Sequence, residues 1–415
     1  ESEKLSREVF VLKDDEDLFK DLCAQRFGAN ELPAVDPQLS TIDRPWQHLY
    51  IKLNIEDMLC KFNENPDFKR FYRVIDISAY ALKSVEFTIV PVTNVKSNFY
   101  YLTALLSKLW NLEKFTVRPG EIFLDLKGCK ALCKGLKNNP DSLRVLDLHY
   151  CHITSDRIKI LEDGLLSSKK LISLNMEGNP IGDDGASSIA KVIRAHDKIT
   201  HLNVTSCALS DTGAEVLATA FYHNQSLKVI RISRNRISTN GMKSIFHKLA
   251  YSRTIEDIDF MCNDGDTASS VATELTRLFE VSTSLKHINF YKTRCSPFFM
   301  SNTLHGLSQN RSLTELDLGS SRFGSCEVAA LGWAVARNRN IRKLYLENSD
   351  IGSCGLRYFS EAIYDTEIAI EARNKAKLVR DLTAPEIEEE LVRGTTVAPL
   401  CDRKIPLMFL NVSPM

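Results

Sequence analysis

The chain has 415 residues, 53 basic and 53 acidic side chains, and a formal charge of zero. This balance argues against nucleic-acid binding, which needs a basic excess or stripe. A hydrophobic content of 44% is ample for a buried core and excludes wholesale disorder. No apolar run approaches the roughly 18 residues of a membrane span, so we expect no membrane partner.

The first residue and the cysteines indicate whether the chain is complete and in which compartment it is located. It begins with Glu1 rather than a start methionine or a signal peptide, so we expect a fragment of a longer protein. The 11 cysteines are odd in number and scattered, unlike the tight, paired spacing of a secreted disulfide framework. We therefore expect reduced thiols and a cytoplasmic location.

Two helices are predicted before the middle of the chain. Residues 18–28 read LFKDLCAQRFG, a helical pattern whose final glycine suits a C-terminal cap. After a polar linker, Pro45 opens a second helix that runs to about residue 62, since proline is favourable in a first helical turn. These helices either cap the next segment or bind a partner as well, and we predict that Trp46 and Tyr50 dock a neighbour.

An internal repeat occupies most of the remaining chain. The pattern L-x-x-L-x-L, with any aliphatic residue or Phe at its three apolar positions, recurs at a spacing of 28 residues with a single step of 30. Its first residues are Leu143, Leu171, Ile199, Leu227, Ile255, Leu285, Leu313 and Ile341. Earlier, Leu112-Phe115-Val117 fits one more unit, and residues 72–77 fit a degenerate strand that opens the array.

A small polar residue follows each pattern, three residues after its last aliphatic residue. We expect its side chain to bond backbone groups where the strand turns into the loop. The first five units have Asn or Cys at this place, namely Cys151, Asn179, Cys207, Asn235 and Asn263. The last three units have Thr293, Ser321 and Ser349 instead, so we expect looser turns there.

A helix is predicted in the second half of each unit. The stretch IGDDG at residues 181–185, with counterparts in later units, offers Asp, Asn or Ser as helix N-caps. Apolar residues then recur at three-to-four spacing, as in Ala186, Ile189, Ala190 and Ile193. Each unit is therefore a strand, a turn and a helix, which indicates the α/β class.

The 28-residue period and the Asn/Cys position resemble the ribonuclease-inhibitor-like leucine-rich repeats. This resemblance implies a leucine-rich-repeat solenoid, a horseshoe with a parallel sheet on its concave face and helices outside. We expect an α-helical cap at residues 1–63, the repeat array at 64–364, and C-terminal helices with an extended tail at 365–415. The tail contains the apolar residues Leu407, Met408, Phe409 and Leu410, and it either folds back on the last repeat or docks into a partner.

The pair LFKDLCAQRFG and PWQHLYIKL resembles the helices that follow an F-box, the module that grips the Skp adaptor of a cullin ubiquitin ligase. It is also similar to the F-box-like region before the repeats in leucine-rich-repeat subunits of the axonemal nexin–dynein regulatory complex. Their W-K-x-x-(Y/F) helix resembles Trp46 to Tyr50. The second resemblance implies a cytoskeletal location in the axoneme of a cilium or flagellum.

Motifs of catalysis are missing from the sequence. It has no GxxxxGK[ST] or GxGxxG phosphate loop, no GxSxG elbow, no HExxH and no CxxC pair. His149, Cys151 and His152 have the residue types of a zinc site, but Cys151 occupies the inward Asn/Cys position. We therefore predict no enzyme, no catalytic residue, no cofactor and no metal.

The residues flanking the central aliphatic of each strand should face the concave side. They form either a solvated polar face or a protein-binding surface. Arg231, Arg234, Tyr291 and Tyr345 stand out, because Arg and Tyr are enriched in interface hot spots. The other predicted interaction residues are Asp147, His149, Asn175, Glu177, Asp259, Asp317 and Glu347.

We predict a non-enzymatic scaffold that binds other protein subunits of a large assembly through its repeats and its terminal extensions. The favoured assembly is axonemal, and the alternative is an F-box-type substrate receptor. An immune-receptor fragment would need a nucleotide-binding module upstream, and ribonuclease inhibition would need a strongly acidic face. We expect no nucleic acid as a partner and no homo-oligomer.

Overall fold

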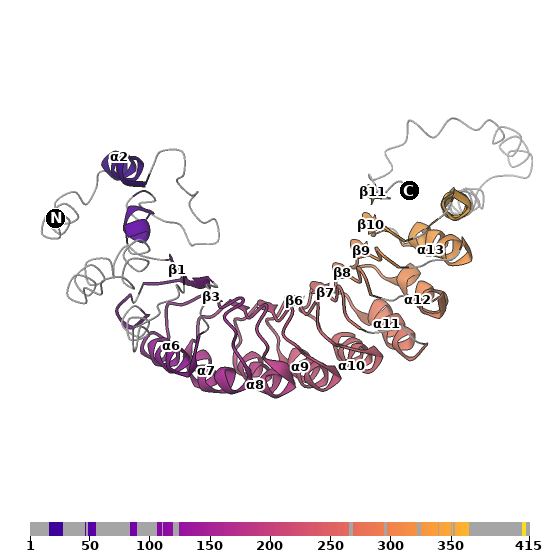
Figure 1. The fold of residues 1–415 in the computed structure, drawn as a ribbon. Helices are drawn as coiled ribbons and strands as arrows, with labels where there is room; N and C mark the ends of the chain where they lie inside the picture. The colour runs from indigo at the N-terminus through magenta and orange to yellow at the C-terminus, as the bar shows by residue number, and fades with distance from the viewer. Residues whose placement is uncertain are drawn as a thin grey trace, which may run out of the picture. The chain divides into compact units, whose positions relative to one another are not determined.

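The computed structural model describes residues 16–27, 46, 49–54, 84–88, 106–109, 111–118, 124–264, 269–293, 297–321, 325–338, 340–349, 351, 353–364 and 409–411. The chain divides into two compact units, Glu1–Asn235 (unit 1) and Arg236–Met415 (unit 2). In each unit, short parallel strands alternate with helices that cover one face of the sheet (Figure 1).

Unit 1 has its described strands in chain order within one parallel sheet. They are β1 (Ser84–Thr88), β2 (Lys114–Arg118), β3 (Val145–Asp147), β4 (Ser173–Asn175), β5 (His201–Asn203) and β6 (Val229–Arg231). Its described helices are α2 (Glu16–Phe27), α6 (Leu126–Asn138), α7 (Ser155–Ser167), α8 (Gly182–Ala195) and α9 (Asp211–His223).

Unit 2 repeats the arrangement. Its described strands are β7 (Asp257–Asp259), β8 (His287–Asn289), β9 (Glu315–Asp317), β10 (Lys343–Tyr345) and β11 (Phe409–Asn411). Its described helices are α10 (Thr239–Leu249), α11 (Ser269–Val281), α12 (Pro297–Gln309), α13 (Ser325–Arg337) and a helix over residues 353–364.

The strands confirm the repeat pattern. We number each repeat from its first aliphatic residue, so that aliphatic residues occupy positions 1, 4 and 6 and the Asn/Cys residue position 9. Each regular strand covers positions 3 to 5, and neighbouring strands pair position for position, as Leu146 does with Leu174. The earlier unit around Phe115 is β2. The sequence did not indicate β1, and the strand expected at 72–77 lies outside the described residues.

The aliphatic positions build the core. In unit 1, Leu146 and Leu174 are both fully buried. In unit 2, the ring of Phe246 packs on Phe260 and Phe290 with centroid distances of 5.1 and 5.8 Å. Burying one such side chain contributes about 1.5–3 kcal/mol, and every repeat adds several, so stability comes from neighbouring repeats stacking.

Position 9 holds the turn after the strand, as predicted. Asn179 donates from Nδ2 to the carbonyl oxygens of Leu148 and Met176, both at 2.8 Å. Its Oδ1 accepts the N–H of Ile153 at 2.9 Å. The thiol of Cys207 lies 3.2 Å from the carbonyl oxygen of Met176. One Asn therefore joins backbone groups of two repeats, whereas a thiol is a weaker and less versatile partner.

The later repeats use shorter side chains at this position. The Thr293 hydroxyl donates to the carbonyl oxygen of Phe260 at 3.3 Å, and that of Ser349 donates to Leu318 at 3.4 Å. The buried Ser321 hydroxyl has no hydrogen-bond partner in the described part of the chain. The backbone of these turns matches that of the earlier repeats, with a φ of 55° at Lys292 and 57° at Ser320 against 54° at Ser206, so the looser turns expected there stay a prediction.

The predicted helix caps are confirmed in part. Ser238 precedes α10 and accepts the N–H of Asn240 at 3.4 Å. Asp183, however, lies in the first turn of α8 and accepts the N–H groups of Ser210 and Gly213 at 2.8 and 3.0 Å. Its carboxylate therefore caps α9, the helix of the next repeat, where the helix dipole favours a negative charge.

A second ladder of buried polar side chains follows the helices, and our sequence analysis missed it. Asn224 donates to the carbonyl oxygens of Ile193 and His196 at 2.7 and 2.8 Å. One repeat earlier His196 takes the equivalent place, 3% exposed, with Nε2 2.9 Å from the carbonyl oxygen of Leu165. Other members are Asn139, Asn310 and Asn338. The recurrence of these polar residues at the repeat spacing could have predicted this ladder from the sequence.

The predicted N-terminal helices pack on each other. The helix predicted at 18–28 is α2, and residues 49–54 lie in the second helix. The buried cluster between them consists of Phe19, Cys23, Leu49 and Tyr50. Trp46 is partly buried against this cluster, with the Lys20 ammonium 5.6 Å from its ring centroid. Packing explains both Trp46 and Tyr50 locally, and their docking to a neighbour stays a prediction.

Part of the predicted apolar tail is a strand. Phe409 and Leu410 lie in β11, which pairs in parallel with β10. The other two predicted tail residues, Leu407 and Met408, lie outside the described residues. In the described strand the tail is folded back on the last repeat, and docking into a partner stays a prediction.

Candidate functional site

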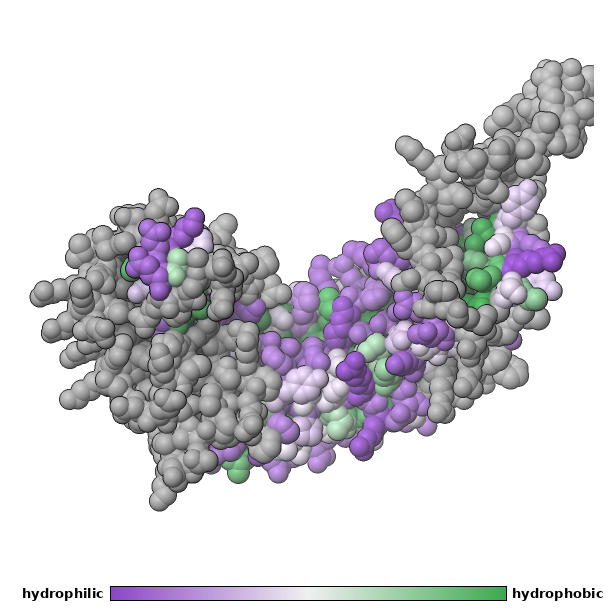
Figure 2. Space-filling view, turned by 45° about the horizontal axis from the view of Figure 1, so that its top comes forward, coloured by the Kyte–Doolittle hydropathy of each residue, from purple (hydrophilic) through white to green (hydrophobic). Residues whose placement is uncertain are grey.

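The predicted interaction residues lie at positions 5, 7 and 8 of the repeats. We call positions 3, 5, 7 and 8 of β3–β6 the unit 1 face, and the same positions of β7–β10 the unit 2 face. The unit 1 face includes Asp147, His149, Asn175, Glu177, Arg231 and Arg234. The unit 2 face includes Asp259, Tyr291, Asp317, Tyr345 and Glu347. In the space-filling view the described repeats are mainly hydrophilic, with paler and green side chains interspersed (Figure 2).

Most side chains at position 5 have a structural role. Asn175 accepts the N–H of Glu177 at 3.0 Å, and Asp317 accepts the N–H of Gly319 at 2.8 Å. Equivalent bonds are made by Asp147, Asn203, Asp259 and Asn289. A short carboxylate or amide oxygen can reach the backbone two residues ahead, so the turn after the strand accounts for Asn and Asp at this position.

Arg231 and Tyr345 break this pattern. Both occupy position 5, and neither has a short side-chain oxygen that could accept the N–H at position 7. Arg231 is half-buried, and Arg234 follows it at position 8 with an exposed side chain. Tyr345 pairs with Asp317 across β9 and β10. Because turn chemistry does not require them, these residues are the better candidates for binding.

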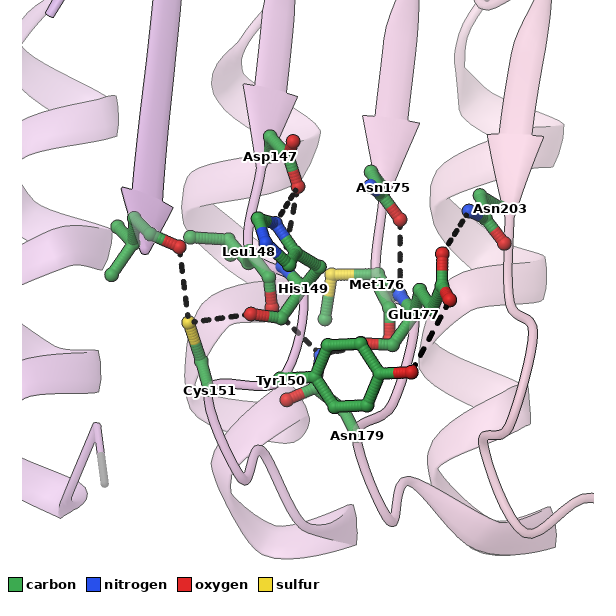
Figure 3. A network of polar contacts seen from close by, with 11 residues as sticks. Asp147, Leu148, His149, Tyr150, Cys151, Asn175, Met176, Glu177, Asn179 and Asn203 are labelled. Carbon is green, nitrogen blue, oxygen red and sulfur yellow. Dashed lines mark hydrogen bonds and ion pairs between the residues drawn. The ribbon is translucent and has the colours of Figure 1, made fainter. Parts of the chain in front are cut away.

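The unit 1 face carries a network of paired polar groups (Figure 3). Nδ1 of His149 lies 2.8 Å from the carboxylate of Asp147. Asn203 donates to Oε2 of Glu177 at 3.0 Å, and the Tyr150 hydroxyl lies 3.4 Å from Oε1 of the same carboxylate. Glu177 is therefore held between two repeats, which makes it a rigid part of the face.

The unit 2 face is richer in carboxylates. Its position 3 forms two pairs, Asp257 with His287 at 2.7 Å and Glu315 with Lys343 at 2.8 Å. Our sequence analysis did not select this column, although it also flanks the central aliphatic residue. The carboxylates of the whole face are Asp257, Asp259, Glu315, Asp317 and Glu347, against the ammonium groups of Lys292 and Lys343.

The carboxyl of Asp317 has a perturbed pKa. Burial raises the pKa of its carboxyl above the ordinary value, and the nearby carboxylates of Glu347 and Asp259 raise it further. The N–H of Gly319 and the imidazole of His287 act in the opposite direction, with smaller effect than burial. A negative charge on Asp317 is thus unfavourable in this site, and an added cation would relieve it.

An aromatic ring lies beside this acid. A Cβ placed on Gly319 would be 2.6 Å from Cδ2 of Tyr291 and 3.1 Å from Oδ1 of Asp317. The Tyr291 ring therefore covers the glycine next to the carboxylate, and the Lys292 ammonium lies 5.4 Å from its centroid. Ring and carboxylate together offer a flat apolar surface with a negative edge.

Three thiols of the repeats are buried and unreactive, and the described residues hold no metal site. Burial raises the pKa of Cys129, Cys151 and Cys207 to about 12, which keeps these thiols protonated and poor nucleophiles at neutral pH. No group of three metal-ligating side chains occurs within the described ranges. In that same part of the chain, every helix is too short or too polar to cross a membrane.

The comparisons with known proteins agree with this architecture. A family model described as "Leucine Rich repeat" matches residues 167–190, 197–218 and 223–246. With the parallel strands, alternating helices and position 9 ladder, this match defines the fold as an α/β leucine-rich-repeat solenoid. The chain is therefore built on a fold class whose members suit protein–protein interaction.

Similar proteins share only part of their length with this chain. "NACHT, LRR and PYD domains-containing protein 14" of Mus musculus is 34% identical over 124 residues, which are 29% of this chain and 12% of the relative. The protein of the same name from Homo sapiens is 29% identical over 207 residues, 48% of this chain and 16% of the relative. Ribonuclease inhibitor of Mus musculus is 26% identical over 124 residues, 30% of this chain and 27% of the relative.

Among solved structures, the tropomodulin C-terminal domain of Caenorhabditis elegans is 18% identical with a TM-score of 0.31, over 39% of this chain and 98% of that one. The matched part of the chain spans less than a third of the length of the two NACHT, LRR and PYD domains-containing proteins and of ribonuclease inhibitor.

Proposed function

We propose that this chain is a non-enzymatic scaffold that binds other proteins through the open faces of its sheet. The observation that carries the proposal is the pattern at position 5. There the turn after the strand accounts for every Asn and Asp, whereas it does not account for Arg231 and Tyr345, whose side chains have no short oxygen to accept the N–H at position 7. Arg and Tyr are the residue types enriched in binding hot spots.

The unit 2 face favours a partner segment that carries Arg or Lys. Its carboxylates outnumber its ammonium groups, and Asp317 is held in a site where a nearby cation would be stabilising. Tyr291 adds an aromatic surface on which a guanidinium group can stack. Rigid strands hold these groups, so little conformational entropy is lost on binding.

The test is affinity purification of the full-length protein from its own cells at moderate salt, followed by mass spectrometry. The double variant Tyr291→Ala with Asp317→Asn should lose specific partners at least tenfold. Tyr251→Ala is the matched control, because Tyr251 is 50% exposed but lies outside the faces. Equal recovery of all partners by the double variant and the wild type would contradict binding through the unit 2 face.

We further propose that the assembly is the axoneme of a cilium or flagellum, in a complex of the nexin–dynein regulatory kind. The support is the resemblance of residues 18–28 and of Trp46 to Tyr50 to the helical region of such subunits, joined here to leucine-rich repeats. Recovery of dynein-regulatory or other axonemal subunits in the same purification is the expected result.

The alternative is an F-box-type substrate receptor, in which the repeat face recruits a target for ubiquitylation. It rests on the same N-terminal helices, which also resemble the segment after an F-box. The purification separates the two proposals directly. Recovery of the Skp adaptor and a cullin without axonemal proteins would overturn the axonemal proposal and favour the receptor.

A further inference from the structure

The last strand of the sheet comes from the distant C-terminal tail. Strand β11 pairs in parallel with β10, in a register that sets Leu410 opposite Leu344 and Asn411 opposite Tyr345. Leu344 is the position 4 residue of the last repeat and is buried. The tail strand thus joins the array in the register that one more repeat would have.

The tail sequence independently carries the repeat pattern. Leu407, Leu410 and Val412 have the spacing of positions 1, 4 and 6, as Ile341, Leu344 and Leu346 do in the last repeat. Pro406 and Pro414 bracket the pattern, and proline removes the N–H that would extend a strand pair. The register in the structure aligns the two patterns without a shift, and a shift of one residue would place Phe409 or Asn411 at position 4.

The outer edge of β10 needs such a partner. Within unit 2, the N–H at position 6 of each inner strand donates to position 5 of the next, as from Phe290 to Asp317 at 2.8 Å and from Leu318 to Tyr345 at 2.9 Å. The corresponding donor of the last repeat is the N–H of Leu346, whose residue is 2% exposed. In β11 the position that would supply the acceptor is Asn411.

A second donor recurs at position 8, as from Ser320 to Glu347 at 2.6 Å. Its counterpart in the last repeat is the N–H of Asn348. Backbone groups at a sheet edge are costly when buried without a partner, and they attract strands of other molecules when exposed.

We propose that the outer edge of β10 is a strand-binding site, and that its occupant is the chain's own C-terminal L-x-x-L-x-V segment. The segment thus covers the last strand of its own array, although it does not follow directly on the last repeat in the sequence. Main-chain hydrogen bonds give this kind of strand addition its affinity, and the alternate side chains give it register. The site is independent of which protein binds the two faces.

The test is hydrogen exchange on the full-length chain. Leu410→Asp places a charge at the position that is buried in every regular repeat, so the tail strand should detach. The amides of Leu346 and Asn348, which belong to the outer edge, should then exchange on the order of tenfold faster or more. The amides of Arg342 and Lys343, which donate to Thr314 on the inner side, and those in β3–β5 of unit 1 should keep their wild-type rates and show that the chain is folded. Asn411→Ser is the matched control, because position 5 lies on the open face, and it should leave exchange unchanged.

The tail can then be supplied separately. A synthetic peptide of residues 403–415, added to the Leu410→Asp chain, should bind in a saturable one-to-one manner and restore slow exchange at the amides of Leu346 and Asn348. The same peptide with Leu410→Asp should do neither. Unchanged exchange in the Leu410→Asp chain, or failure of the wild-type peptide to restore protection, would overturn the proposal. A wild-type dimer that becomes monomeric on Leu410→Asp would overturn cis closure.

Discussion

The ring of Tyr150 lies over Gly178 of the next repeat, so closely that a β-carbon on residue 178 would overlap Cδ1 and Cε1 of the ring. Gly178 occupies position 8 with a φ of 70°. In other repeats this position holds non-glycine residues at a similar φ, among them Ser206 at 54° and Arg234 at 53°. The left-handed backbone therefore does not by itself require glycine here, whereas a β-carbon at this position would force the half-exposed ring of Tyr150 to move.

We predict that Gly178→Ala lowers the free energy of unfolding by about 2–4 kcal/mol, from steric overlap with the ring and from a left-handed backbone cost of about 1–2 kcal/mol. In a Tyr150→Ala background, Gly178→Ala should lower the free energy of unfolding only by the cost of the left-handed backbone. Chemical denaturation of the four proteins of this double-mutant cycle gives the coupling. Equal losses in both backgrounds would show that the ring is not the cause.

Periodicity predicted the array because one pattern determines both the strand and its neighbours. Once Leu174 is assigned to position 4, the parallel register follows for Leu146 and Leu202, and the structure has it so. The flanking residues could likewise be assigned to the open face. The same spacing predicted that position 9 bonds backbone, which Asn179 does.

Contacts between repeats were harder to predict, because they depend on which atoms of neighbouring turns meet. Nothing within residues 181–185 indicates that Asp183 caps the next helix. His196 is a lone histidine in the sequence, and only its place in a ladder with Asn224 explains its burial. The acids of position 5 were selected as interaction residues, although the turn already accounts for those that accept the N–H at position 7.

The Asn/Cys ladder offers a comparison at one repeat position. Asn235 donates to the carbonyl oxygens of Val204 and Ile232, both at 2.9 Å, and accepts the N–H of Cys207 at 2.9 Å. We predict that Asn235→Ala lowers the free energy of unfolding by about 3 kcal/mol. Several buried backbone groups lose their hydrogen-bond partners, each loss costs about 1–3 kcal/mol, and these costs are not fully additive.

The matched control is Ser321→Ala, at the same position of another repeat. The Ser321 hydroxyl has no partner among the described residues, so its removal should change the free energy of unfolding by less than about 0.5 kcal/mol. Urea titration of both variants measures the contrast. A loss for Ser321→Ala as large as that for Asn235→Ala would mean that packing, rather than hydrogen bonding, makes position 9 important.

His196 should make stability depend on pH. Burial lowers the pKa of its imidazole below the ordinary 6.5, against a smaller opposite effect of the hydrogen bond to Leu165. The unfolded chain then binds the proton more readily than the folded one. Stability is complete above about pH 6.5 and falls as the pH drops below it, levelling off below the folded-state pKa. We expect the free energy of unfolding to fall by about 1 kcal/mol between pH 7 and pH 5, and chemical denaturation at a series of pH values in this range measures it.

His196→Asn is the informative variant, because Asn224, Asn310 and Asn338 fill the same place in other repeats and bond the same kind of carbonyl. An amide does not titrate, so the variant should keep its stability near pH 7 and lose the His196 part of the acid dependence. An identical pH profile for variant and wild type would assign the acid loss to other groups.

Asp317→Asn should stabilise the free protein and weaken binding at the unit 2 face. Burial raises the pKa of the Asp317 carboxyl, so the folded state holds its proton more tightly than the unfolded state. Stability therefore falls as the pH rises through the folded-state pKa, and the charged form is a net cost at neutral pH. Asn keeps an oxygen to accept the N–H of Gly319 and carries no charge. We expect the free energy of unfolding of Asp317→Asn to exceed that of the wild type by about 1 kcal/mol at pH 7, and this difference should shrink toward pH 4.

For the partner recovered with the wild type, Asp317→Asn should raise the dissociation constant on the order of tenfold, and the difference should narrow at high salt. Asp264→Asn is the charge-matched control, since Asp264 is exposed and lies outside the unit 2 face. Denaturation at pH 7 and pH 4, with binding at two salt concentrations, measures both effects. A variant that binds as well as the wild type but is more stable would leave Asp317 without a role in recognition, and the unit 2 face would have to act through Tyr291 and Tyr345 alone.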